Sequence, residues 1–186
     1  MLTTVVLAKL WSVEYSRPVS GEPLALDLVN TAWPDGEGGC DVLADRSGHE
    51  EWLRENDLPG PSTAAARREL LQARDEIRAA LETPGPAAFA ALDGILERGC
   101  LRIWATKPSA REELEIEREW RVPWLAVRSL LRLLDEHPAR VRKCANPDCP
   151  FWFLDTTRSG TRRWCSMTVC GNRLKARRHY ERQHQS

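Results

Sequence analysis

Four cysteines near the end of the chain have the spacing of a metal site. They form two C-x4-C pairs, Cys144/Cys149 and Cys165/Cys170, with fifteen residues between the pairs. Thiolates are good zinc ligands, and a tetrahedral site takes four of them at about 2.3 Å. The pattern therefore predicts one structural Zn²⁺ held by these four side chains. Two disulfides, or four cysteines in an apolar core, are the alternatives.

Basic side chains gather around these cysteines and beyond them. Residues 140–186 contain eleven Lys and Arg against three Asp and Glu, a net charge of +8, and residues 1–139 carry −8. A basic module on an acidic body suits a polyanion such as DNA, although the two halves could also attract each other. The residues expected to bind nucleic acid are Arg158, Arg162, Arg163, Asn172, Arg173, Lys175, Arg177, Arg178 and Arg182.

Local patterns suggest how this segment folds. Residues 150–155 resemble a strand whose aromatic side chains can pack around the metal, and a basic helix is expected from Thr168 to about Arg182. A hairpin that supplies two thiols, followed by a helix start that supplies two more, is typical of a treble-clef or zinc-ribbon-like module. Such a helix can present Lys and Arg to phosphates and Asn or Arg to base edges.

Upstream of the cysteines the chain predicts a mostly helical body. Apolar residues recur with helical period, and Gly and Pro separate the segments. The spacing of Ser47 and Glu50 is typical of a capping box, and Ser62 or Thr63 can cap the longest helix. The helices are expected at about 24–32, 48–56, 64–82, 87–98 and 124–137.

A small β-hairpin is expected between the last two of these helices. Its strands would be 101–106 and 114–120, in which apolar and charged residues alternate, with 107–110 in the connection. The predicted fold class is therefore α+β. A mostly helical body with a small hairpin spans residues 1–138, and the four-cysteine zinc finger spans residues 140–186.

Two polar residues interrupt the first apolar helix. Asp27 and Asn30 lie three apart on one helical face, where they could line a pocket or hold neighbouring loops; the second role is favoured. With Trp33 nearby, these three residues make a candidate ligand pocket. The sequence has no G-x-S-x-G or H-E-x-x-H motif, so we expect binding rather than catalysis.

Composition limits the class of protein and the cellular location that we expect. With 42% hydrophobic and 29% charged residues it has the balance of a globular protein, and no segment has the ~18 apolar residues that span a bilayer. Lys9 interrupts the apolar N-terminal stretch, which lacks the pattern of a signal peptide. We therefore expect no membrane association and a cytoplasmic location, in which cysteines stay reduced.

The C-terminal segment closely resembles the CGNR-type zinc finger, named for a motif that stands here as Cys170-Gly171-Asn172-Arg173. The resemblance covers residues 144–182. It includes both cysteine pairs, residues 153–155, 162–167 and 175–180. The body is similar to the ABATE domain that precedes this finger in the family, through residues 24–31 and 52–53. Residues 1–16 lie outside the family pattern, which implies an extension or a poorly chosen start. The resemblance implies a bacterial transcription regulator linked to stress.

Two classes of function follow from these observations. The first is a DNA-binding transcription regulator, in which zinc folds the finger, the basic helix meets DNA, and the body senses a small-molecule effector or forms a homodimer. The alternative is a small-molecule-binding protein or enzyme with its site in the body and a purely structural finger. A protein-interaction adaptor is a third, weaker candidate.

Overall fold

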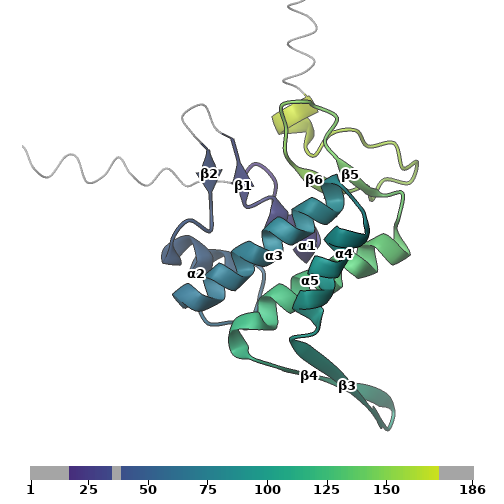
Figure 1. Cartoon of the computed structure of the whole chain (residues 1–186). Coiled ribbons are helices and arrows are strands. Elements are labelled where there is room, and N and C mark those ends of the chain that lie inside the picture. Colours follow the sequence, from purple (N-terminus) through teal and green to yellow (C-terminus); the bar gives the residue numbers. More distant parts are fainter. Residues whose placement is uncertain (1–16, 35–38, 172–186) are drawn as a thin grey trace, which may run out of the picture.

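The computed structural model describes residues 17–34 and 39–171. A layer of helices forms the body, with a projecting hairpin at one end and the cysteine-rich finger at the other (Figure 1). Helix α3 packs against α1, α4 and α5, and α5 also contacts α1 and α4. The helices are α1 (Leu24–Val29), α2 (Arg46–Glu55), α3 (Ala64–Glu82), α4 (Pro86–Leu96) and α5 (Arg121–Glu136).

Helix α3 shows how the apolar pattern becomes packing. Thr63 caps it, accepting a hydrogen bond at 3.1 Å from the backbone N–H of Ala66, as expected for a Thr N-cap. Its apolar residues at helical spacing, among them Leu70 and Ile77, are buried against α1, α4 and α5. The predicted helix and its capping residue are confirmed.

Helix α2 begins earlier than the sequence suggested, and the capping-box prediction is wrong. Asp45 is the N-cap, because its carboxylate accepts from the N–H of Gly48 at 2.8 Å. Glu50 pairs instead with Arg46 and with Ser62. A Cβ on Gly48 would lie 1.8 Å from the carbonyl oxygen of Val42, so only glycine fits where the preceding chain crosses the helix.

In the described ranges the strands pair as three antiparallel, two-stranded sheets. The strands β1 (Ala32–Trp33) and β2 (Cys40–Asp41) make a short hairpin that the sequence suggested only as a loop. The strands β5 (Val141–Lys143) and β6 (Trp152–Leu154) belong to the finger, where β6 lies inside the expected strand 150–155.

The β3–β4 hairpin confirms the predicted hairpin but corrects the bounds of its strands. Strands β3 (Gly99–Thr106) and β4 (Ser109–Ile116) pair from Thr106 opposite Ser109 to Gly99 opposite Ile116. The turn takes only two residues, so the second strand starts at residue 109, and residues 118–120 form a 3₁₀ turn, η2. Strand β4 carries charged residues soon after the turn because most of its side chains are exposed.

Two apolar cores meet at β6. The larger lies among the helices, and the smaller surrounds the four cysteines. Side chains alternate along a strand, so Phe151 and Phe153 enter the smaller core while Trp152 and Leu154 contact the larger. The domain boundary placed between residues 138 and 140 stays a prediction, and β6 ties the two sides together.

Candidate metal centre

The four cysteines of the finger come together in one buried cluster. Their Sγ atoms all lie within 4.8 Å of one another, and each residue is buried. The Sγ of Cys165 is 3.7 Å from the Sγ atoms of Cys149 and Cys170. A disulfide would bring two sulfurs to about 2.05 Å, so these are separate thiols.

The spacing of the sulfurs fits zinc. In a tetrahedral site with Zn–S bonds of about 2.3 Å, neighbouring sulfurs are about 3.8 Å apart, close to the separations seen here. All four ligands come from the protein and are buried, which is typical of structural rather than catalytic zinc. The finger therefore holds one structural Zn²⁺, and Cys144, Cys149, Cys165 and Cys170 are the residues positioned to bind it.

The electrostatics of the cluster call for a cation. The hydrogen bond with Cys149, burial and the charges of neighbouring thiols raise the pKa of Cys165, and burial raises the pKa of Cys170. The same hydrogen bond lowers the pKa of Cys149. Without a cation, the cluster stabilises one thiolate and destabilises further ones. Four thiolates therefore need a cation to offset their negative charges. Zn²⁺ does so, because it deprotonates the thiols that it binds.

Groups around the sulfurs hold them in place. The side chain of Asn146, buried inside the first C-x4-C pair, donates from Nδ2 to the Sγ of Cys170 at 3.7 Å. The backbone N–H of Phe151 donates to Cys149. Such donors orient zinc ligands and reduce the cost of their negative charge. Asn146 was not expected among the site residues, although its position between two ligands was a usable signal.

A short helical turn and Arg162 position the second pair of cysteines, Cys165 and Cys170. Residues Met167–Gly171 form a π-helical turn that carries Cys170. Arg162 donates to the carbonyl oxygens of Trp164, at 2.9 Å, and of Cys165, and it lies over the ring of Phe153. Arg162 therefore holds the finger together, and we do not carry it into the proposed set of DNA contacts.

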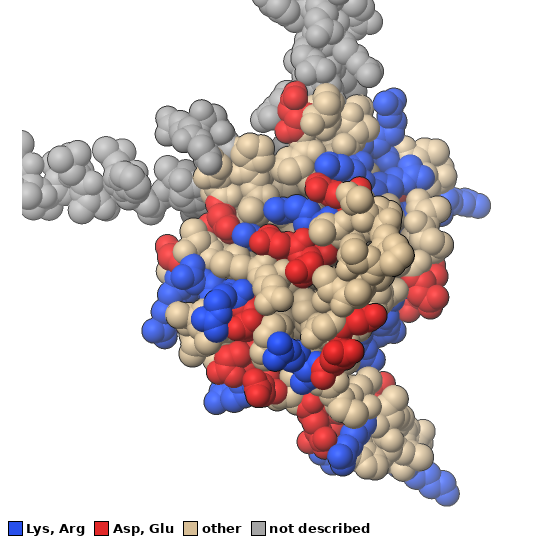
Figure 2. Space-filling view, viewed as in Figure 1, with Lys and Arg blue, Asp and Glu red and all other residues tan. Residues whose placement is uncertain are grey.

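Two other predicted contact residues lie on the surface of the finger. Arg158 and Arg163 are exposed, and the guanidinium of Arg163 lies 5.2 Å from the Trp164 ring centroid. On the face shown in Figure 2, Lys and Arg gather over the finger, while both charges alternate over the helices. The remaining predicted contacts lie outside the described residues: Asn172, Arg173, Lys175, Arg177, Arg178 and Arg182.

The architecture can now be compared with known families. Residues 140–183 match the CGNR zinc finger, and residues 22–144 match ABATE, a family described as "Putative stress-induced transcription regulator". The ABATE match spans about two thirds of the chain. The protein belongs to the ABATE family. No curated protein matches the chain.

In the ABATE body, the carboxylate of Asp27 accepts hydrogen bonds from several segments. It is fully buried and accepts from Arg17 at 2.8 Å, from the N–H of Gly21 at 3.0 Å and from the indole of Trp52 at 2.8 Å. These donors come from the segment before α1 and from α2. All of these contacts are within the protein, so Asp27 joins neighbouring segments.

Asn30 joins the ABATE body to the finger. Its amide donates to the carbonyl oxygen of Trp152 at 2.8 Å and accepts from the same residue's N–H at 3.0 Å. Nearby, Glu22 accepts from the N–H of Leu154 at 2.9 Å. Burial raises the pKa of Glu22, against the lowering effect of this bond and of Arg162. Strand β6 is thus hydrogen-bonded to the start of the ABATE body.

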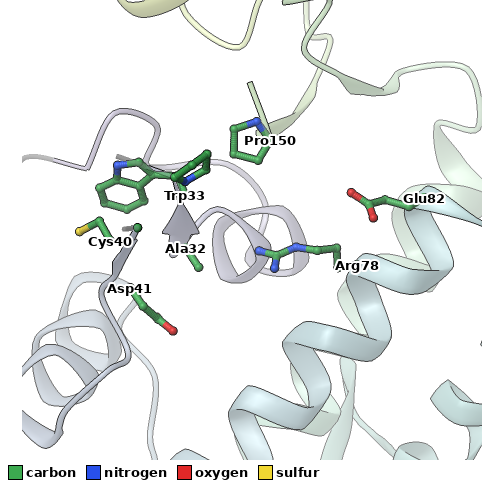
Figure 3. A pocket seen from close by; sticks show the side chains of 9 residues that line it. Ala32, Trp33, Cys40, Asp41, Arg78, Glu82 and Pro150 are labelled. Carbon is green, nitrogen blue, oxygen red and sulfur yellow. The ribbon is translucent and has the colours of Figure 1, made fainter. Parts of the chain in front are cut away.

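Trp33 is the member of the predicted pocket that lines a cavity. An open cavity of about 440 Å³ lies between the β1–β2 hairpin, α3 and the finger, and Asp27 and Asn30 are not among its lining residues. Trp33, Cys40, Asp41, Arg78, Glu82 and Pro150 surround it in Figure 3. Trp33 also packs against Phe151 of the finger, with ring centroids 5.9 Å apart.

The cavity is lined by charged residues that the sequence did not single out. Asp41 forms a two-pronged ion pair with Arg74 at 2.6 and 2.8 Å, and Glu82 pairs with Lys143 at 3.1 Å. Arg78 donates to the carbonyl oxygen of Val29 at 2.7 Å. Asp41 of β2 therefore supplies the acceptor for Arg74, and α1 supplies the acceptor for Arg78.

The described residues contain no helix that is long and apolar enough to cross a membrane.

Proposed function

We propose that this ABATE protein is a DNA-binding transcription regulator whose zinc finger presents a basic segment to the phosphate backbone. The observation that carries the proposal is the position of the metal centre. Its last ligand, Cys170, is separated by one glycine from residues 172–182, which contain five Lys and Arg. Zinc binding therefore fixes the point at which the basic segment leaves the finger.

The charge distribution supports a polyanionic partner. Residues 140–186 carry +8, and two of their arginines, Arg158 and Arg163, are exposed on the finger. Arginine and lysine at phosphates provide most of the sequence-independent affinity for DNA. The family description also names transcription regulation.

In this proposal each part has a separate task. Zinc supplies folding energy to the finger and takes no part in a reaction. Arg158, Arg163, Arg173, Lys175, Arg177, Arg178 and Arg182 contact phosphates, and Asn172 contacts base edges. The ABATE body senses a ligand or joins two copies. The cytoplasm, a reducing compartment, keeps the four thiols available to zinc.

The salt dependence of DNA binding tests this proposal. Each phosphate contact contributes about −0.9 to the slope of log K against log salt concentration. Replacing two arginines, in Arg173→Ala/Arg177→Ala, should weaken binding to all sequences and make the slope shallower by about 2. Fluorescence anisotropy with labelled duplexes at several salt concentrations measures both quantities.

A matched control separates local contacts from net charge. Arg68→Ala/Arg132→Ala removes the same charge from exposed sites on the helical body, and it should change binding little. Because β6 completes the core of the body, substitutions are cleaner controls than a chain without its finger. If the wild-type protein binds no DNA at low salt, or if both double variants weaken binding equally, the proposal fails.

The cavity beside Trp33 favours a second candidate, a small-molecule-binding protein. Trp33 offers an aromatic face and Arg78 a positive charge, which suits a planar molecule with a carboxylate. Calorimetric titration with small aromatic acids tests this candidate. Trp33→Ala should abolish the binding heat, whereas Trp104→Ala, a tryptophan on β3 outside the cavity lining, should keep it. Equal heats for both variants would contradict the candidate.

A further inference from the structure

The β3–β4 hairpin projects from the end of the body opposite the finger (Figure 1). At its base Leu114 is buried and Ile116 is half-buried, which anchors the hairpin to the helices. Further out, Ile103 is 62% exposed and Trp104 is 39% exposed. A two-stranded hairpin is marginally stable by itself in water, so a projecting hairpin with large apolar residues gains from a further strand.

The two edges of this hairpin differ in chemistry. Natural edge strands are protected from unwanted pairing by charged residues. Strand β4 follows that rule, with Arg111, Glu112, Glu113 and Glu115 among its eight residues. Strand β3 carries a single charge, Arg102. Within the described residues the sheet contains these two strands alone. The outer edge of β3 therefore has no strand beside it and lacks the charged residues that protect β4.

We propose that β3 pairs with β3 of a second copy of this chain, antiparallel about a two-fold axis at Ile103. The two hairpins then form one four-stranded sheet. Ile103 lies opposite Ile103 of the partner subunit, and Leu101 lies opposite Ala105 of the partner subunit. On the other face Arg102 lies opposite Trp104 of the partner subunit, where a guanidinium and an indole attract each other.

The side chains of β3 are compatible with pairing to β3 of a second copy, whereas those of β4 are not compatible with pairing to a second β4. Facing residues in a symmetric antiparallel pair lie on the same side of the sheet, so one residue meets its own counterpart at the axis. For β4 that residue would be Arg111, Glu112 or Glu113 near the middle of the strand, and like charges directly opposite are destabilising. With Ile103 at the axis, β3 places no like charges opposite each other.

The dimer joins the two chains at the ends remote from their fingers. The hairpin and the finger lie at opposite ends of the molecule (Figure 1), so the two fingers point away from the shared sheet. Self-association through β3 therefore does not depend on DNA binding, and each can be tested without the other.

Sedimentation equilibrium of the full zinc-bound chain tests the association. The wild-type protein should dimerise at micromolar concentrations. Ile103→Lys places two ammonium groups at the axis and should raise the dimer Kd at least tenfold, by about 1.4 kcal/mol or more. Ala110→Lys adds the same charge on the same face, but on β4 away from the new pairing. It should leave the Kd within about threefold of wild type.

A crosslinking experiment tests the register. With Ile103 at the axis, Thr106 lies opposite Cys100 of the partner subunit, and Cys100 is an exposed thiol. Thr106→Cys should therefore give a disulfide-linked dimer under mild oxidation, and adding Cys100→Ser should abolish it. Within one chain the two positions are six residues apart, roughly 20 Å along the strand, too far to bond. Ala105→Cys, which faces the other side of the sheet, should not crosslink to Cys100.

The outcomes are distinct. A concentration-dependent dimer that Ile103→Lys dissociates, with crosslinking by Thr106→Cys, supports the β3 interface. A wild-type protein that stays monomeric overturns the proposal. So does a dimer that Ile103→Lys leaves intact or that Thr106→Cys cannot crosslink, because its contacts would lie elsewhere. Zinc content equal to wild type in each variant shows that a lost dimer does not result from a lost fold.

Discussion

Several buried polar residues pair with a residue from another segment of the chain. Asp27 receives donors from the segment before α1 and from α2, and Asn30 pairs with the backbone of Trp152. Arg74, which is 7% exposed, reaches Asp41 and the hydroxyl of Thr31. Buried polar groups stabilise a fold only when they are paired, so these residues are sensitive points.

The metal ligands give the most direct test at a single residue. Cys144→Ser replaces a soft thiolate with a hydroxyl that binds zinc poorly, so zinc content should fall well below one per chain. Elemental analysis of the purified protein measures it. Cys100→Ser, which changes an exposed thiol on β3, should keep the metal. If Cys144→Ser retained wild-type zinc content, the ligand assignment would be wrong.

The Asp41–Arg74 pair makes stability depend on pH. Burial raises the pKa of Asp41, but the hydrogen bonds and charge of Arg74 outweigh burial, so the pKa lies below 3.8. A depressed carboxyl pKa stabilises the fold above pH 3.8, and this contribution is lost as the pH falls through the folded-state value. Asp41→Asn should lower the free energy of unfolding at neutral pH by about 2 kcal/mol, since Asp41 is partly exposed.

Urea unfolding at neutral and acidic pH checks this prediction. The difference between the wild type and Asp41→Asn should shrink as the pH falls below about 4. Asp75→Asn is the matched control, because Asp75 is largely exposed and lies 3.9 Å from the same arginine. It should change the free energy of unfolding by no more than about 0.5 kcal/mol. A pH-independent difference for Asp41→Asn would exclude the ion pair as its cause.

Among the elements, β6 has the widest effect because it contributes to two cores. Its alternating side chains place Trp152 among the helices and Phe153 beside the cysteines. Helix α1 lies against β6, and Asn30 at the end of α1 donates one hydrogen bond to the backbone of Trp152 and accepts another from it. The finger core also includes Val19 and is contacted by Trp33, both from the N-terminal part of the chain. The two halves are therefore packed as one structure at this strand.

Asn30→Ala tests the contact between α1 and β6. The substitution leaves the buried N–H and C=O of Trp152 without their partners, which should cost about 2 kcal/mol or more in the free energy of unfolding. Gln72→Ala, at an exposed position on α3, should have almost no effect. Thermal unfolding and zinc release to a chromogenic chelator measure the two consequences. Equal behaviour of both variants would show that this contact does not hold the finger to the body.

For the whole molecule, the metal and the helical body should be coupled. Trp152 belongs to the larger core, yet it lies on a strand between two zinc ligands, Cys149 and Cys165. If zinc is removed, the finger loses its folding energy and β6 loses its anchor. The helical core then loses the packing of Trp152. A cavity left by a large side chain typically lowers the free energy of unfolding by several kcal/mol.

Chelation therefore should lower the melting temperature of the helices themselves, by several degrees for a protein of this size. Circular dichroism at helical wavelengths, with and without a strong chelator, measures it. In Trp152→Ala the helical core depends less on β6, so the shift caused by the chelator should be smaller. Identical helical melting with and without zinc would show that the two halves fold independently.

Local patterns in the sequence were sufficient for the features that depend on short-range chemistry. Ligand spacing identified the zinc site, because two C-x4-C pairs place four thiols within one small module. Apolar periodicity predicted the long helices, and Thr63 was a correct cap for α3. The start of α2 was missed because Asp45 and Ser47 are both good capping residues, and the crossing chain at Val42 decided between them.

The remaining features depend on contacts between residues far apart in the chain. No local pattern pairs Asn30 with Trp152, 122 positions away, or brings Asp41 to Arg74. Arg162 is of a residue type that contacts phosphates, yet it donates to carbonyl oxygens inside the finger and pairs with Glu22 of the body. Side-chain type and spacing therefore determined the metal site and most helices. Tertiary packing decided which polar residues join the two cores, because only folding shows which partner each buried group meets.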